Sequence, residues 1–228
     1  MNRKILLCLA VVVLIAGVVA APCAAQTLQK GVSVEMAATS YATPMPAADE
    51  ANAWIVAVTR DGWLFFGTEK FTPEGLTEAM KERPRNRDQK LHIKADVRAP
   101  FADVEKVLQA GRTVWFESPV LLTSQPEQTA PGTIVPPMGL EVAVGTPPEG
   151  SIVVQVLDTG EAKPDIRVNG ADVNVEVLRN MLGRILQNSK QRSVVVEAGG
   201  TLRFGQVAQV IDACRGAGAR VTVGEPEL

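Results

Sequence analysis

The stretch that decides the fold is residues 193–223, SVVVEAGGTLRFGQVAQVIDACRGAGARVTV. It opens with β-branched residues and a Gly-Gly turn. Apolar residues then recur at helical spacing, and two glycines lead into a second β-rich run. Strand–helix–strand units of this length place both strands in one sheet, with the helix packed on its face. The stretch therefore predicts half of a small two-layer α/β unit.

A second copy of this unit lies upstream. LHIKADVRAPF, residues 91–101, aligns without a gap with VVVEAGGTLRF, residues 194–204, a shift of 103 residues. The apolar positions of the following helices then fall in step: Phe101, Val104, Val107 and Leu108 match Phe204, Val207, Val210 and Ile211. The alternative is two unrelated units that share a common pattern. The apolar positions of the two copies stay in register over a whole strand–helix unit, which favours a tandem duplication.

The N-terminus is typical of a secretory signal peptide. Arg3 and Lys4 precede an uncharged apolar run, residues 5–21, and small residues lead to a cleavage site after Ala25. Cleavage there would leave the protein in the periplasm. Two alternatives stay open: the 17-residue run could be retained as a membrane anchor, or Cys23 could carry a lipid.

Composition sets further bounds. Removal of the leader leaves 203 of the 228 residues, enough for two small domains. The chain has 23 basic and 25 acidic residues, so it has no general electrostatic reason to bind nucleic acid. Cys8 and Cys23 lie in the leader, which leaves Cys214 alone and excludes an internal disulfide framework.

The predicted fold is α+β, with two tandem ββαβαβ two-layer domains after an N-terminal apolar helix. Arg60-Asp61-Gly62 predicts a hairpin turn, and Thr72-Pro73 predicts the start of a helix. The linkers are marked by low periodicity and by proline, although Leu140, Val142 and Val144, with Ile134 and Val135, could add a short edge strand. The expected boundaries are 1–25 for the signal peptide or anchor, 26–53 for a linker, 54–124 for the first domain, 125–150 for a Pro-rich linker and 151–228 for the second domain.

A set of motifs occurs in the same order in both copies. The first copy contains VTRDGWLFFG, TPEGLTEAM, LHIKAD and PFADVEKVL, and the second contains VVQVLDTG, IRVNG, VVVEAGG and RFGQVAQVIDACRGAGARV. In this order and spacing the chain resembles the periplasmic domain of the ExbD/TolR biopolymer-transport family, present twice. The resemblance covers residue 30 to the C-terminus. It implies a membrane-associated transport system with ExbB/TolQ-like or TonB-like partners, contact with peptidoglycan, and homodimers formed through sheet edges, with the closing strand near Val221 exposed.

One departure from the family bears on function. Members that conduct protons carry an Asp in their transmembrane helix, where a carboxylate is costly and therefore functional. Residues 5–21 contain no Asp, Glu, His or Lys. We therefore predict a non-enzymatic periplasmic binding or scaffold component of a Ton/Tol-like energy-transducing system that cannot itself conduct protons. The alternative is a membrane-anchored stator subunit of the transport motor, located in the inner membrane and facing the periplasm.

No residue pattern indicates catalysis, a cofactor or a metal site. The single histidine, His92, alternates with Leu91 and Ile93 and is expected on the wetter face of its strand. Cys214 is expected in the core, and Gly199-Gly200 is expected to be a turn and not a phosphate cradle. The candidate binding residues are Trp115, which stands where the second copy has Gly218, and the nearby Arg112, as contacts for a glycan or a partner.

Overall fold

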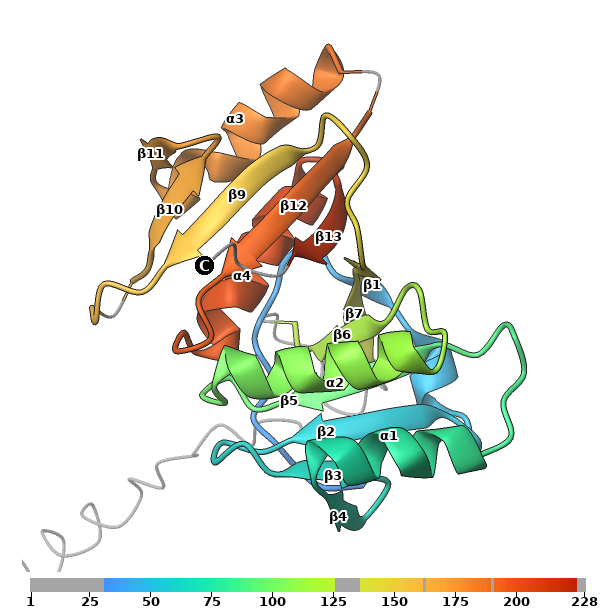
Figure 1. The fold of residues 1–228 in the computed structure, drawn as a ribbon. Coiled ribbons are helices and arrows are strands. Elements are labelled where there is room, and N and C mark those ends of the chain that lie inside the picture. The colour runs from blue at the N-terminus through green and yellow to red at the C-terminus, as the bar shows by residue number, and fades with distance from the viewer. Residues whose placement is uncertain (1–30, 126–135, 162, 190, 225–228) are drawn as a thin grey trace, which may run out of the picture.

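The computed structural model describes residues 31–125, 136–161, 163–189 and 191–224. This part of the chain is α+β, with four α-helices and two mixed sheets (Figure 1). The apolar helix expected at the N-terminus lies outside the described residues. Of the helices within them, none has the length and apolar character needed to cross a membrane.

The first copy, residues 54–124, forms a sheet with two helices on one face. Its strand order is β1-β7-β6-β5-β2-β3-β4, in which β2, β5 and β6 are parallel. The elements are β1 (Thr43–Pro44) and the 3-10 helix η1 (Pro46–Asp49) ahead of the copy, then β2 (Trp54–Val58), β3 (Leu64–Phe66), β4 (Glu69–Phe71), α1 (Pro73–Glu82), β5 (Leu91–Ala95), α2 (Phe101–Thr113) and β6 (Val120–Thr123). As predicted, Pro73 begins α1 and the Thr72 side chain caps it by accepting from the amide of Gly75.

The second copy, residues 151–224, repeats this topology. Its sheet has the order β11-β10-β9-β12-β13-β8, and again the first, fourth and last strands of the copy are parallel. The elements are β9 (Ile152–Leu157), β10 (Asp165–Val168), β11 (Ala171–Val173), α3 (Val175–Gln187), β12 (Ser193–Ala198), α4 (Phe204–Gly216) and β13 (Arg220–Gly224). Each copy thus contains the expected ββαβαβ succession plus one short extra strand, β4 or β11, which is only three residues long.

A single connecting segment joins the two sheets. Residues 138–144 form β7 (Met138–Glu141), which pairs with β6, and β8 (Ala143–Val144), which pairs with β13. The expected edge strand around Leu140 and Val144 is therefore present. It also corrects one expectation: the closing strands are not exposed edges, because β7 pairs along the whole of β6, β8 pairs with Thr222 and Val223 of β13, and Val221 is buried.

The two copies meet through a reciprocal contact at the start of α2 and α4 (Figure 1). Pro100 and Arg203, which are equivalent under the 103-residue shift, form an antiparallel bridge. The amides of Phe101 and Ala102 donate to the carbonyls of Leu202 and Gly200. The equivalent amides in the second copy, those of Phe204 and Gly205, donate to the carbonyls of Ala99 and Val97. The contact therefore has local two-fold symmetry within one chain.

This contact supplies hydrogen-bond partners to the first amides of α2 and α4. Thr72 caps α1 and Asn174 caps α3, but neither α2 nor α4 receives a hydrogen bond from the side chain of its N-cap residue. The first amides of a helix have no partner within the helix. Here each copy caps the other through two backbone hydrogen bonds, each contributing about 1 kcal/mol.

Small and large residues alternate across the contact. Gly205 lies against Val97, and Gly200 lies against Ala102. Val97 is equivalent to Gly200, and Ala102 is equivalent to Gly205. If two first copies formed the same contact, Val97 would lie against Ala102. If two second copies formed it, Gly200 would lie against Gly205. Close-packed interiors tolerate neither overlap nor voids without cost. The contact therefore favours pairing between unlike copies.

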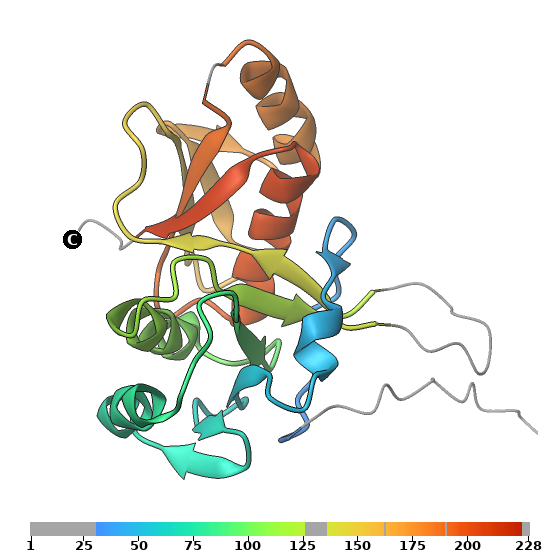
Figure 2. The ribbon, with the colours of Figure 1, turned by 90° about the vertical axis from the view of Figure 1, so that its right-hand side faces the viewer.

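Residues 31–50 cross the face of the first sheet that the helices leave open (Figure 2). On that face Met36, Met45 and Ala48 pack against Val120 and Leu122. Two buried carboxylates hold the segment from different copies. Asp96 accepts from the amide of Glu35, and Asp212 on α4 accepts from the amides of Ser40 and Tyr41.

This cover corrects the prediction for His92. Strand alternation does place the imidazole opposite Leu91 and Ile93, but only 3% of the residue is exposed, because the face expected to be wet is covered. Its Nδ1 atom is buried and has no hydrogen-bond partner among the residues that the structure describes. Burial lowers the pKa of His92 below 6.5, and the charge of Lys90 adds to this, while a backbone hydrogen bond at Trp54 and the charge of Glu50 oppose it.

The glycine contact yields a first prediction. We expect Gly205→Ala to destabilise the protein by about 1–3 kcal/mol, because the added methyl group meets Val97. The double variant with Val97→Ala should recover part of that loss, since the Val97 side chain is the nearest obstacle. Denaturant unfolding measures both changes.

Gly183→Ala is the matched control. Gly183 is also helical, but a methyl group there meets nothing within 4 Å, so this variant should gain about 0.5–1 kcal/mol. Equal effects at Gly205 and Gly183 would contradict the role of the contact.

The burial of His92 yields a second prediction. The pKa of His92 is lower in the folded state than in the unfolded chain, so protonation of His92 favours unfolding. The stability that comes from keeping His92 neutral is therefore complete above about pH 7. It is lost as the pH falls through 6.5 toward the lowered pKa. We expect the melting temperature to decrease between pH 7.5 and pH 5, and His92→Gln to flatten that decrease whatever its effect at pH 7.5. An unchanged slope in the variant would contradict the assignment.

Candidate functional site

Trp115 is an exposed residue with a strained backbone. It follows the end of α2, 80% of it is exposed, and its φ is 67°. At the equivalent position of the second copy Gly218 has a φ of 82°. Bulky side chains rarely adopt this left-handed region, and each instance costs about 1–3 kcal/mol. Both copies therefore have a left-handed residue here, and the first copy has a bulky side chain that suits this conformation poorly.

Arginines surround Trp115. Its amide donates to the carbonyl of Arg112, and its carbonyl accepts from Nη2 of Arg85 at 3.2 Å. The Arg85 guanidinium stacks over the ring of Phe116 at 4.2 Å, which fixes the start of the following loop. Arg112 is exposed in the last turn of α2, next to Gly145. The two predicted site residues are therefore neighbours in the chain, and an exposed indole with the exposed Arg112 guanidinium can bind a flat or anionic partner group.

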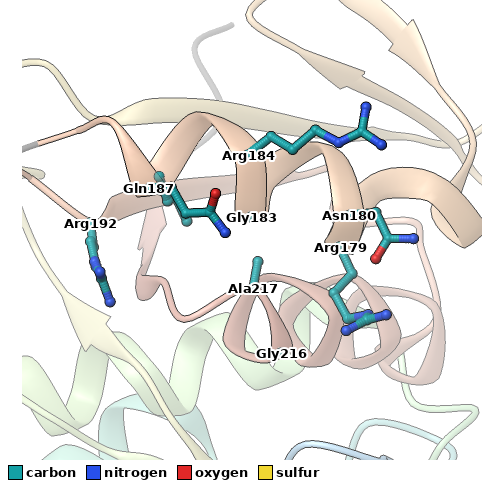
Figure 3. Close-up of a pocket in the computed structure, with 9 residues that line it drawn as sticks. Arg179, Asn180, Gly183, Arg184, Gln187, Arg192, Gly216 and Ala217 are labelled. Atoms are coloured by element: carbon teal, nitrogen blue, oxygen red, sulfur yellow. The ribbon is translucent and has the colours of Figure 1, made fainter.

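A second surface, which the sequence analysis missed, lies in the second copy between α3 and α4 (Figure 3). It is a groove of about 500 Å³, with Gly183, Gly216 and Ala217 as small lining residues. Arg192 and Arg179 lie at opposite ends, with Gln187 and Ala217 between them, and Arg184 projects from the outer side of α3. The ring of Tyr41 packs against Gly216 and lies 5.5 Å from the Arg179 guanidinium.

The arginines of this groove have no acidic partners. Within the described part of the chain, the ion pairs of arginine are made by Arg98 and Arg167, whereas Arg179, Arg184 and Arg192 form none. All three are exposed. Their charges are therefore available to an external group.

Comparison of the two copies could have revealed the groove from sequence. Leu76 and Met80 of α1 correspond to Leu178 and Leu182 of α3, and all four are buried. Under this alignment Thr77 corresponds to Arg179, and Glu82 to Arg184. The groove between α1 and α2 accordingly has a different lining, with Glu74 and Glu105 beside Lys106.

The remaining candidates have structural roles. Cys214 is fully buried, which confirms it as a core residue, and burial raises the pKa of its thiol to about 12. The turn at Gly199-Gly200 cannot cradle a phosphate, because the first amides of α4 already donate to Ala99 and Val97. Burial acts to raise the pKa of Asp96, but hydrogen bonds from Arg98 and the Glu35 amide outweigh it, and the pKa lies below its usual range. Among the described residues no group of His, Cys, Asp and Glu side chains could hold a metal ion.

The strain at Trp115 yields a third prediction. Trp115→Gly should stabilise the protein by about 1 kcal/mol in denaturant unfolding, because glycine adopts a positive φ without steric cost and little buried surface is lost. Gly218→Ala is the reciprocal control, and it should lose a similar amount. A destabilised Trp115→Gly variant would show that the indole supports the fold.

The comparisons with known proteins agree with these features. The family model described as Biopolymer transport protein ExbD/TolR matches the chain twice, over residues 5–127 and 123–223. Neither the curated proteins nor the solved structures give a match. The two matches together span most of the chain: the first includes β1 to β6 with α1 and α2, and the second includes β7 to β12 and most of β13 with α3 and α4. The chain therefore belongs to the ExbD/TolR family of biopolymer-transport proteins.

Proposed function

We propose that this chain is a non-enzymatic periplasmic binding or scaffold component of a Ton/Tol-like energy-transducing transport system. Membership of the ExbD/TolR family supports a role in biopolymer transport, and that family works with ExbB/TolQ and with TonB/TolA-type partners. The domain boundaries 54–124 and 151–228 are part of this proposal. So is peptidoglycan as a ligand.

The observation that carries a binding role is Trp115. A fold that needs a left-handed residue at this position can use glycine, as Gly218 does. Because 80% of Trp115 is exposed, burial of its side chain offsets little of the strain in its backbone. Strained, exposed residues cluster where proteins contact ligands, and Trp and Arg are enriched among the residues that dominate interfaces.

The proposal includes an inability to conduct protons. Residues 5–21, which the first family match includes from its start, contain no carboxylate, imidazole or basic side chain that could carry protons. A proton path through the bilayer needs such a group. In this proposal the chain contributes binding and positioning, and a partner supplies any proton-carrying carboxylate.

The test is a pull-down of the full-length chain with purified peptidoglycan sacculi. We expect the chain to sediment with the sacculi, and Trp115→Ala and Arg112→Ala each to weaken binding about tenfold, a typical loss for a central contact residue. Trp63→Ala is the matched control, because Trp63 is also exposed, at 52%, but lies on the hairpin between β2 and β3. It should bind as the parent chain does.

Failure to sediment would remove peptidoglycan from the proposal. Co-purification of ExbB/TolQ-like or TonB-like proteins that is lost in Trp115→Ala would then assign the site to a protein partner. Equal binding by all variants in both assays would overturn the role of Trp115.

One observation favours the second candidate, a membrane-anchored stator subunit. The first family match begins at residue 5, inside the apolar run, as expected if that run corresponds to the membrane segment of the family. Carbonate washing of membranes separates the candidates. Release of the chain supports the exported form, and retention supports the anchored form in the inner membrane.

A further inference from the structure

We infer that the groove between α3 and α4 binds an extended acidic segment of a partner polypeptide. This inference concerns the second copy and a surface distinct from Trp115, so it does not depend on the proposed contact with peptidoglycan. The groove has a volume of about 500 Å³, within the range of about 300–1,000 Å³ that is usual for ligand sites.

Charge determines the class of ligand. Arg179 and Arg192 place guanidinium groups at the two ends of one groove, and Arg184 adds a third on the outer side of α3, in a chain that is acidic overall. Arginines near helix ends also offset the helix dipole, but each helix C-terminus carries only about half a negative charge. The two helix ends leave most of the arginine charge uncompensated. Guanidinium groups pair with carboxylates through two parallel hydrogen bonds, which gives both affinity and orientation.

The spacing of the charges favours an extended ligand over a single small anion. Arg179 and Arg192 lie at opposite ends of the groove, with Gln187 and the small Ala217 between them (Figure 3). A ligand that pairs with both guanidinium groups must extend along the groove past Gln187 and Ala217. A peptide in extended form can place acidic side chains at both ends and its backbone beside the Gln187 amide.

A polypeptide fits the groove better than a membrane surface does. The small residues Gly183, Gly216 and Ala217 line a hollow between two helices, and a narrow chain can enter it where a flat bilayer cannot. Space is available because a methyl group at Gly183 would meet nothing within 4 Å.

Divergence between the copies supports the same conclusion. The fold alone does not require arginine, since α1 occupies the equivalent place with Thr77 and Glu82 where α3 has Arg179 and Arg184. The two copies share buried residues at the intervening core positions. The exposed side of the first helix therefore differs in charge between the copies, whereas the buried positions are apolar in both.

The experiment measures fluorescence anisotropy of a labelled peptide with alternating Glu and Ser residues, titrated with the full-length chain in non-ionic detergent. A Gln/Ser peptide of the same length is the neutral probe. We expect the acidic peptide to bind, the neutral one to bind at least tenfold more weakly, and affinity to fall as salt increases. Arg179→Ala and Arg192→Ala should each weaken binding at least fivefold, and Arg192→Lys should restore only part of it because lysine lacks the planar fork.

Arg60→Ala is the matched control, because Arg60 is an exposed arginine on the hairpin of the first copy. Loss of binding equal to that of the groove variants would overturn the inference, as would equal binding of the neutral peptide. Displacement by inorganic phosphate or by soluble short-chain phosphatidylglycerol, at matched ionic strength and with affinity equal to the peptide's, would overturn it in favour of a small-anion or lipid site. Peptidoglycan binding that persists in the groove variants would leave the proposed function intact.

Discussion

The arrangement of this chain depends on the exchange of four backbone hydrogen bonds at the start of α2 and α4. Neither helix is capped by the side chain of its N-cap residue, although Gln206 of α4 accepts from the Arg203 amide, and each helix obtains carbonyl partners from the loop that precedes the other. Unpaired amides buried at such a contact would cost about 1–3 kcal/mol each. The two sheets are therefore held in one geometry, and the segments that cross between them, residues 31–50 and 138–144, strengthen a contact that the helices already define.

Local and periodic features were predictable from the sequence, whereas contacts between remote segments were not. The duplication, the hairpin at Gly62 and the Thr72 cap follow from spacing and residue type, and the structure contains each of them. The burial of His92 depends on a segment more than 40 residues upstream that shows no periodicity, so strand alternation alone gave the correct face and the wrong environment. The groove was not predicted because the similarity between the copies is clearest in α2 and α4, whereas the differences that mark the groove, at Arg179 and Arg184, lie between α1 and α3.

The duplication also identifies which residues the fold needs. Positions that keep their character in both copies, such as Phe101 and Phe204 or Leu76 and Leu178, are buried. Positions that differ, such as Trp115 and Gly218 or Thr77 and Arg179, lie at the surface or line a groove. One copy thus serves as an internal reference for the other, and both candidate surfaces emerge from this comparison.

The unlike packing of Val97 on Gly205 and of Ala102 on Gly200 has a consequence for assembly. Two separate domains would associate according to their concentrations and could form three kinds of pair. A covalent link fixes the local concentration of the partner at a high value that does not vary with expression. Because the side chains also disfavour like pairs, every molecule presents the same two surfaces in the same stoichiometry, one of each, even when the protein is scarce.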